Sequence, residues 1–422
     1  MINAEFSRPN LVALYTFFGN GVKLASGPLI LLAISSELSA EQIGFYYVFI
    51  SVVALKSLLE LGITNVLKQH IVHEGDNHSK ISELINFNYH WFAVISLLFL
   101  FFCLFLSEFL FFEYSGEIKW EIPWTATSLF SCASLLLMSL HVISDSAGQQ
   151  VLLRRSIAIS SVGYCFVLLI SLINGLGLYS IPMAILVSEV LLAYLLRGVF
   201  LESKIHIKYE PKNLIKIFNE ILPLLSKVAI VWFVGYFYWN GFSLISFKFL
   251  GPEAAGLILF SIALVKSVND ICTSLVISQM TIYSEYIAKK EINKAFSIFK
   301  KTALIGLTLL VCGYVLIFLA IWRLPEFYLF EKLMDVTNIR QLMLFFITVY
   351  FITCCNNFVR CFKIEPFVYL STFNAITVPG AFFYSLYTDQ NNLFLLSTYF
   401  SFVALLISSY ILFSRLKFYE KI

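Results

Sequence analysis

Two copies of one charged pattern lie in apolar surroundings in this sequence. Lys56 and Glu60 in "LKSLLELG" are matched, 210 residues further on, by Lys266 and Asp270 in "VKSVNDIC". In a helix, residues four positions apart lie on the same face, so each lysine would be close to its acid. Both pairs fall inside apolar runs about as long as the roughly 20 residues that cross a bilayer. A charge at that depth costs at least about 2.5–3.5 kcal/mol, which predicts a partner or a wet cavity.

Three further charged residues, Lys23, Glu189 and Lys227, also fall inside apolar runs. A lysine placed four residues before its acid is worth only a few tenths of a kcal/mol, which cannot offset insertion. We therefore expect a solvated central cavity, with a purely structural charge network as the alternative. Four lysines against three acids make such a cavity cationic and suited to an anionic ligand. The candidate substrate-binding lysines are Lys23, Lys56, Lys227 and Lys266. The candidate ion-coupling acids are Glu60, Glu189 and Asp270, since an intramembrane carboxylate can change its protonation state.

A dense aromatic segment, "VWFVGYFYWNG", follows Lys227. It places Tyr236, Tyr238, Trp239 and Asn240 together, and aromatic faces with amides suit sugar rings. These four residues are therefore candidate substrate-binding residues. The alternative is an aromatic belt at the membrane interface, where tyrosine and tryptophan are enriched.

The elements that must position these residues are transmembrane helices. The chain of 422 residues is 59% hydrophobic and 13% charged, whereas soluble domains carry about 25% charged residues. A β-barrel would show alternating segments of about 10 residues, which are not seen. The fold class is therefore an all-α integral membrane protein with about twelve transmembrane helices. The expected spans are 11–35, 43–66, 89–112, 124–145, 156–174, 179–200, 221–247, 254–278, 302–322, 341–362, 366–387 and 393–414.

The distribution of basic residues and a repeated sequence pattern predict the orientation and grouping of these spans. With both termini in the cytoplasm, twenty of the 29 Lys and Arg residues lie in inner segments and five in outer loops, as the positive-inside rule requires. The pattern L-x-x-E-x-x-G precedes both lysine motifs, so that Glu41 aligns with Glu253 and Gly44 with Gly256. We therefore predict two six-helix pseudo-repeats, 1–200 and 221–422, joined by a basic cytoplasmic linker, 201–220. Repeats with an even number of spans run in the same direction.

Several motifs are missing from the sequence. It has no G-x-x-x-x-G-K-[ST] loop for ATP and no H-E-x-x-H. The eight cysteines fall mostly in apolar runs and are interpreted as small core residues. His70, His73 and His78 are interpreted as solvated loop residues. No metal site, cofactor, nucleic-acid partner or enzymatic activity is expected.

The segment from Arg8 to Glu74 resembles the start of Wzx-type O-antigen flippases, a polysaccharide-transporter branch of the MOP superfamily. The resemblance lies in "RPNLVALYTFFGNGVKLASGPLILLAI", in "SAEQIGFYYVFISVVALKSLLELGITNVLKQHIVHE" and in "LGPEAAGLILFSIALVKSV". It implies two bundles in a V around a central cavity. It also implies flipping of undecaprenyl-diphosphate-linked O-antigen repeat units to the periplasmic leaflet of a bacterial inner membrane. The resemblance further implies alternating access coupled to an ion gradient. It also implies that the polymerase and the chain-length regulator of lipopolysaccharide biosynthesis are partners.

Two other functions remain open from the sequence. A MATE-like exporter of small molecules would share the fold, although cationic drugs favour an anionic cavity. An O-antigen polymerase or membrane glycosyltransferase would need a large outer loop, and the segment 323–340 is short. A lipid II flippase would be expected to have two further helices.

Overall fold

The computed structural model describes residues 9–74, 77–204, 207, 211–362, 364 and 366–419. Every regular element in these ranges is a helix, and ten of their helices are long and apolar enough to cross a membrane. The predicted all-α membrane class is thus confirmed. The count differs from twelve because the apolar stretch Trp232–Ala288 contains two predicted spans, and because α14 (Val368–Thr388) is not among the ten.

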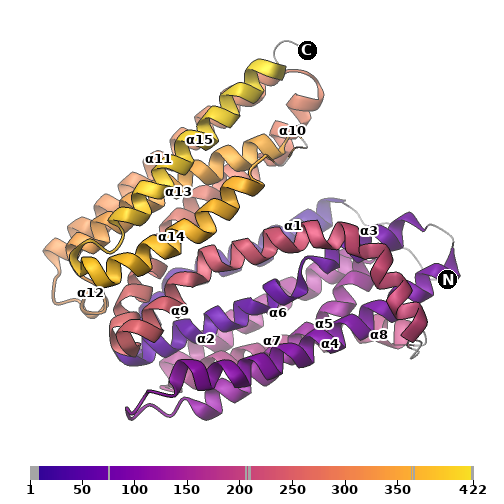
Figure 1. The fold of residues 1–422 in the computed structure, drawn as a ribbon, viewed down its shortest axis with the longest axis horizontal. Helices are drawn as coiled ribbons and strands as arrows, with labels where there is room; N and C mark the ends of the chain where they lie inside the picture. The colour runs from indigo at the N-terminus through magenta and orange to yellow at the C-terminus, as the bar shows by residue number, and fades with distance from the viewer. Residues whose placement is uncertain are drawn as a thin grey trace. The chain divides into compact units, whose positions relative to one another are not determined.

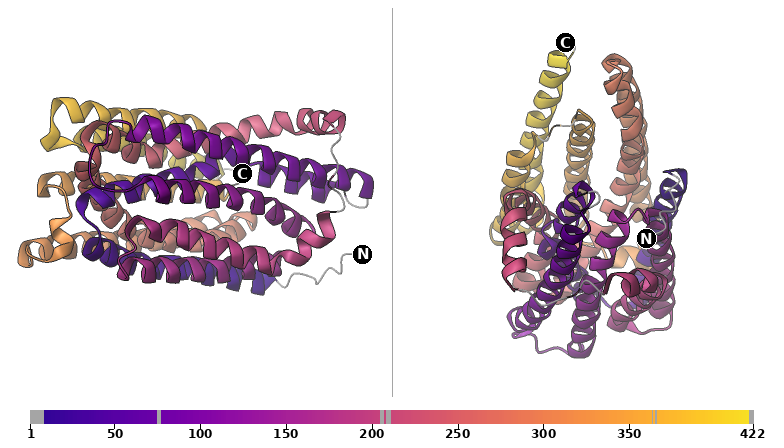
Figure 2. Two further views of the ribbon diagram at one scale, coloured as in Figure 1. Left: turned by 90° about the horizontal axis from the view of Figure 1, so that it is seen from below. Right: turned by 90° about the vertical axis from the view of Figure 1, so that its right-hand side faces the viewer.

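The chain forms two compact units, of which the first comprises Met1–Tyr236 and Phe247–Glu253. Its helices lie lengthwise beside one another (Figures 1 and 2). The closest pairs are α1 with α6, α6 with α7, and α4 with α5. The helices are α1 (Pro9–Glu37), α2 (Ala40–Glu60), α3 (Ile63–His73), α4 (His78–Phe111), α5 (Glu121–Ser146), α6 (Gln150–Ile173), α7 (Ser180–Leu195), α8 (Arg197–Ser203) and the first part of α9 (Pro211–Ser278).

The second compact unit comprises Phe237–Ser246 and Ala254–Ile422. Within it, α13 and α14 both pack against α15, and α11 packs against α10 and α13. Its remaining helices are α10 (Met280–Ala288), α11 (Ile292–Arg323), α12 (Tyr328–Glu331), α13 (Val336–Arg360), α14 and α15 (Leu395–Tyr419). The predicted bundles 1–200 and 221–422 around a central cavity stay a prediction.

Four predicted spans are divided, shortened or merged in the structure. The span expected at 43–66 is divided into α2 and α3, because Leu61 and Gly62 adopt left-handed conformations with φ of 54° and 72°. The span expected at 179–200 ends as α7 at Leu195 and is followed by α8. The spans expected at 221–247 and 254–278 form one long helix, α9, interrupted where Gly251 is non-helical with φ of 81°.

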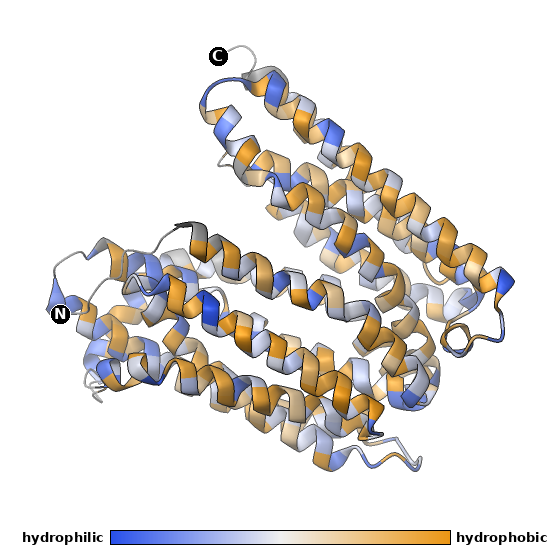
Figure 3. Ribbon diagram, turned by 180° about the vertical axis from the view of Figure 1, so that it is seen from behind, coloured by the Kyte–Doolittle hydropathy of each residue, from blue (hydrophilic) through white to orange (hydrophobic). Residues whose placement is uncertain are grey.

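The outward surfaces of the helices are apolar, as a lipid environment requires. Large side chains such as Phe17, Phe101, Phe105 and Ile376 are more than half exposed along helix bodies. Hydrophobic residues predominate along the helices, whereas hydrophilic residues gather at loops and helix ends (Figure 3). Exposed apolar surface on this scale marks contact with a membrane or with other proteins.

The N-terminal half of α4 packs against segments that follow α7 in the chain. The Lys80 ammonium lies 2.5 Å from Glu220 of α9, and the Trp91 ring stacks on Phe218 at 6.0 Å between centroids. The described flanks of the predicted linker therefore pack on the first unit.

The two L-x-x-E-x-x-G patterns begin close to each other in space. Ser39 caps α2, accepting a hydrogen bond from the Gln42 amide while the Gln42 side chain accepts one from the Ser39 amide. One turn later, Gly44 lies so close to Pro252 that a Cβ placed there would be 2.0 Å from the Pro252 carbonyl oxygen. Glycine is therefore required where the start of α2 meets the turn before the second repeat.

Gly44→Ala is expected to destabilise the protein by about 1–3 kcal/mol, because a backbone carbonyl cannot yield as a flexible side chain does. Thermal unfolding of the detergent-solubilised protein measures the effect. The matched control is Gly21→Ala in α1, where a Cβ meets nothing within 4 Å. An equal melting temperature for the two variants would contradict this close contact.

Candidate functional site

Lys56 and Glu189 are brought together inside the first unit. Lys56 lies on α2 and donates a hydrogen bond to the Ser134 hydroxyl of α5, with 3.0 Å between Nζ and Oγ. Glu189 of α7 interacts electrostatically with Lys56 and with the same serine. Its Oε2 atom is buried and has no hydrogen-bond partner among the described residues. Three helices thus contribute to one polar cluster, which we call the Lys56 cluster (Lys56, Ser134 and Glu189).

Glu60 is separate from the Lys56 cluster. It is the last residue of α2 and only 5% exposed, and its carboxyl group lies beside Thr64 at the start of α3. The ion pairs found among the described residues do not include Lys56 with Glu60. The left-handed turn at Leu61 and Gly62 follows directly, so Glu60 marks the break between two helical segments.

The second copy of the motif behaves differently. Lys266 forms an ion pair with Asp270 on its own helix, at 2.5 Å between Nζ and Oδ2. Its ammonium group also lies 5.2 Å from the centroid of the Trp239 ring, within the range of a cation–π interaction. Both partners belong to the second unit. The expected pairing by helical spacing is therefore realised at Lys266 and replaced at Lys56 by a bond to another helix.

The predicted aromatic patch is divided by the structure. Tyr238 and Trp239 meet edge to face, with 4.9 Å between ring centroids. Together with Lys266 they line a small cavity of about 20 Å³, closed by phenylalanines including Phe242. Such a volume holds about one water molecule, so a sugar would enter only if these rings moved.

Tyr236 has a packing role in the first unit. Its hydroxyl donates a hydrogen bond to the Ser51 carbonyl oxygen over 3.1 Å, and the side chain is buried. Asn240 is partly buried on α9 and makes interactions of its own. The roles predicted for Tyr236 and Asn240 in substrate binding stay predictions.

The structure shows less about the two remaining candidate lysines, Lys23 and Lys227. Lys23 is exposed on α1, and no ion pair found among the described side chains includes it. Lys227 lies in α9, but its side chain is outside the described residues. Their predicted contact with a substrate stays a prediction.

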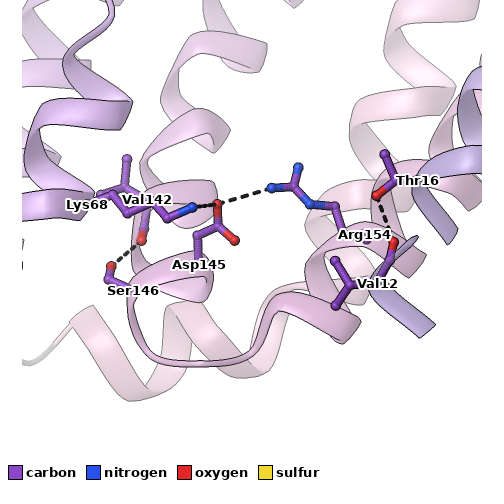
Figure 4. A network of polar contacts seen from close by, with 7 residues as sticks. All are labelled: Val12, Thr16, Lys68, Val142, Asp145, Ser146 and Arg154. Carbon is purple, nitrogen blue, oxygen red and sulfur yellow. Dashed lines mark hydrogen bonds and ion pairs between the residues drawn. The ribbon is translucent and has the colours of Figure 1, made fainter. Parts of the chain in front are cut away.

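One charged network was not anticipated as a site. The Asp145 carboxylate, nearly buried at the end of α5, is 2.8 Å from Lys68 of α3 and 3.2 Å from Arg154 of α6 (Figure 4). In the sequence, Lys68 and Arg154 belong to the twenty basic residues of the inner segments. The sequence signal for this network was an acid in the last turn of a span, Asp145, followed nine residues later by Arg154. The network connects α3, α5 and α6, and its α3 residue follows the α2–α3 break in the chain.

The described residues contain no group of three or more His, Cys, Asp or Glu side chains placed to hold a metal ion. All eight cysteines lie in the described ranges and are unpaired, and only Cys312 is exposed. Their interpretation as small core residues is confirmed for the other seven.

No protein-family model matches the chain, and no curated protein matches it. Solved structures of transporters do. A MOP superfamily transporter from Pyrococcus furiosus, whose binding pocket of reverse polarity suggests a different function, is 12% identical with a TM-score of 0.57. A MATE protein in complex with MaD5 is 11% identical with a TM-score of 0.59. In both, 98% of this chain and 96% of the other are covered.

An outward-facing multidrug resistance MATE transporter of the MOP superfamily is 13% identical, with a TM-score of 0.55 over 97% of this chain and 96% of the other. At such low identities the likeness concerns the fold. The chain therefore has the multi-pass helical fold of the MATE and MOP transporters.

Proposed function

We propose that the protein is a flippase for undecaprenyl-diphosphate-linked O-antigen or polysaccharide repeat units. It moves them from the cytoplasmic to the periplasmic leaflet of a bacterial inner membrane by alternating access, driven by an ion gradient. The observation that carries the proposal is a lysine at corresponding motif positions in each unit, Lys56 and Lys266, in a fold shared with transporters. Both termini lie in the cytoplasm in this proposal.

The chemistry of the two lysines supports an anionic, lipid-linked sugar as substrate. An ammonium group binds phosphate as a point charge, less tightly than a bidentate guanidinium. Weak and exchangeable binding suits a ligand that must be released. Lys266 lies against Trp239 and near Tyr238, so a cation and stacking surfaces occur together for a diphosphate and a sugar ring.

The acids provide the coupling in this proposal. Asp270 competes with the substrate for Lys266, since the two already form an ion pair. Glu189 plays the corresponding part beside Lys56. Protonation or cation binding at either carboxylate would release its lysine for the diphosphate. Glu60, at the α2–α3 break, is the third candidate. The polymerase and chain-length regulator of the same pathway are the proposed protein partners.

A MATE-like exporter of small molecules is the second candidate. The structural neighbours favour it, because several are MATE proteins and one is a multidrug resistance transporter. The described aromatic cavity around Trp239 would suit an aromatic ligand, but its charged member, Lys266, would repel a cationic drug.

Deleting the gene distinguishes these functions. We expect lipid-linked repeat units to accumulate on the cytoplasmic side and the surface polymer to disappear, with both defects reversed by the wild-type gene. Labelling the glycolipids in membrane vesicles of known orientation shows in which leaflet the repeat units lie. Single repeat units that still reach the surface would indicate a polymerase. Normal polymer with increased drug sensitivity would indicate an exporter, and either result would overturn the proposal.

A further inference from the structure

A cavity of about 500 Å³ lies in the first unit, where α2 begins and α4 ends. Its walls come from the start of α2, the end of α4 with the loop that follows, and the segment Phe247–Glu253 of α9. Small-molecule sites typically have volumes of about 300–1,000 Å³. In the predicted topology this is the outer end of the unit, and Glu41 in its wall lies on α2 about four helical turns before Lys56.

Both copies of the L-x-x-E-x-x-G pattern contribute residues to this cavity. Glu41 and Glu253, which align in the two L-x-x-E-x-x-G patterns, both line it. The close packing of Gly44 on Pro252 brings the two patterns together. Each glutamate lies in a first helical turn, where negative charge stabilises the helix. That role needs no cavity, and it does not account for the other charged residues on the walls.

The remaining polar lining comes from α9 and the loop after α4. Lys248 donates a hydrogen bond to Glu113 over 3.3 Å and lies 5.1 Å from the centroid of the Phe109 ring. With Glu41 and Glu253, the lining contains three carboxylates and one ammonium group, a formal charge of −2. Leu110 and Phe247 supply apolar walls. The cavity is thus anionic, in contrast to the lysines within the spans.

Tyr114 adds a hydroxyl group held in place by the loop. Its oxygen accepts a hydrogen bond from the Ile118 amide over 3.0 Å. Partial burial and a hydrogen bond donated to the Glu41 carboxylate raise the pKa of the Tyr114 phenol, so the phenol stays protonated and helps to hold Glu41 in the cavity wall. Ser115 contributes a second hydroxyl group to the lining.

The lining selects a class of ligand. Metal binding is not indicated, because the described residues include no three-ligand group. Phosphates and acidic sugars are repelled by the net negative charge. Carboxylates accept hydrogen bonds from hydroxyl and ammonium groups, and these charge-assisted bonds are strong.

We propose that this cavity is a binding site for an amino sugar, recognised through its hydroxyl groups and protonated amine. The choice of a saccharide over other hydroxylated amines rests on the proposed function. The site would hold the sugar part of a translocated repeat unit at the outer end, while Lys56 of the same compact unit engages its diphosphate.

The test measures binding to the purified full-length protein in lipid nanodiscs, by ligand-observed NMR titration with three probes. Glucosamine, glucose and glucuronate have the same ring size and different charges. We expect glucosamine to bind most tightly, glucose more weakly and glucuronate not at all. Glu41→Gln and Glu253→Gln should each weaken glucosamine binding by about 2- to 12-fold.

Lys248→Gln should have the opposite effect, tightening glucosamine binding by about 1.4- to 5-fold, because it removes a positive charge from the walls. Misfolding cannot produce tighter binding, so this variant separates recognition from stability. Glu121→Gln, an exposed glutamate in the first turn of α5 that does not line the cavity, is the matched control and should change nothing.

Equal binding of glucuronate and glucosamine would overturn the proposal, as would unchanged affinity in both glutamate variants. Neither result depends on the deletion experiment. Lipid-linked units that accumulate on deletion, without glucosamine binding, would leave the flippase proposal standing and remove this one.

Discussion

Replacing Lys266 with Ala is expected to lower surface polymer about 10- to 100-fold in a deletion strain that carries the variant gene. Loss of one charge-assisted contact corresponds to about 1.5–3 kcal/mol, and each 1.4 kcal/mol is a factor of ten. Lys266 is the residue through which Asp270 and Trp239 are connected. The polysaccharide ladder is compared at equal protein levels in the membrane.

Variants around Lys266 identify the physical cause of that loss. Lys266→Arg keeps the charge and the contact with Trp239, so it should retain more polymer than the Ala variant. Trp239→Ala should lower polymer more mildly, because a cation–π contact is worth about 0.5–2 kcal/mol. The matched control is Lys289→Ala, since Lys289 is also paired four residues away, with Glu285 at 2.5 Å. A normal ladder from Lys266→Ala would contradict a role for this lysine in transport.

Replacing Lys56 with Met is expected to lower the free energy of unfolding by about 2–3 kcal/mol and to abolish transport. The substitution leaves the Glu189 carboxylate buried without its cation, and an unsatisfied buried charged group costs at least about 1–3 kcal/mol. Thermal unfolding in detergent measures stability, and the ladder measures transport. Lys23→Met should change stability by less than about 0.5 kcal/mol, because Lys23 is exposed.

A double variant separates the structural role of the Lys56 cluster from its function. Lys56→Met combined with Glu189→Gln removes both of the charges that interact electrostatically, and replacing two such buried charges together by uncharged residues is often nearly neutral for stability. We therefore expect stability to recover and transport to stay absent. Normal transport by the double variant would show that the cluster only holds helices together.

The class of the protein could be predicted from composition and apolar run length, because a bilayer admits few structures. Every backbone polar group must be paired within the hydrocarbon, which leaves helices or closed barrels. Runs of about 20 apolar residues distinguish the helices. Boundaries were less predictable. The division of α2 from α3 depends on Leu61, a residue that rarely adopts a left-handed conformation.

Several side-chain partners could not be predicted, because they come from helices distant in the chain. Helical spacing alone implied the pair of Lys266 with Asp270. It implied the same for Lys56 with Glu60, yet Lys56 bonds to Ser134, 78 residues away. Asp145 pairs with Lys68, 77 residues away, for the same reason. Such contacts depend on which helices pack together.

What the sequence determined by itself was the membrane class, the repeated motif and the lysines within the spans. These follow from local physics, since hydropathy and charge cost act residue by residue along each helix. The tertiary structure alone decided which charges pair, that Tyr236 packs while Trp239 meets Lys266, and that Glu41 and Glu253 share one cavity. Interhelical packing sets these outcomes, because close contacts such as that of Gly44 with Pro252 fix which surfaces meet.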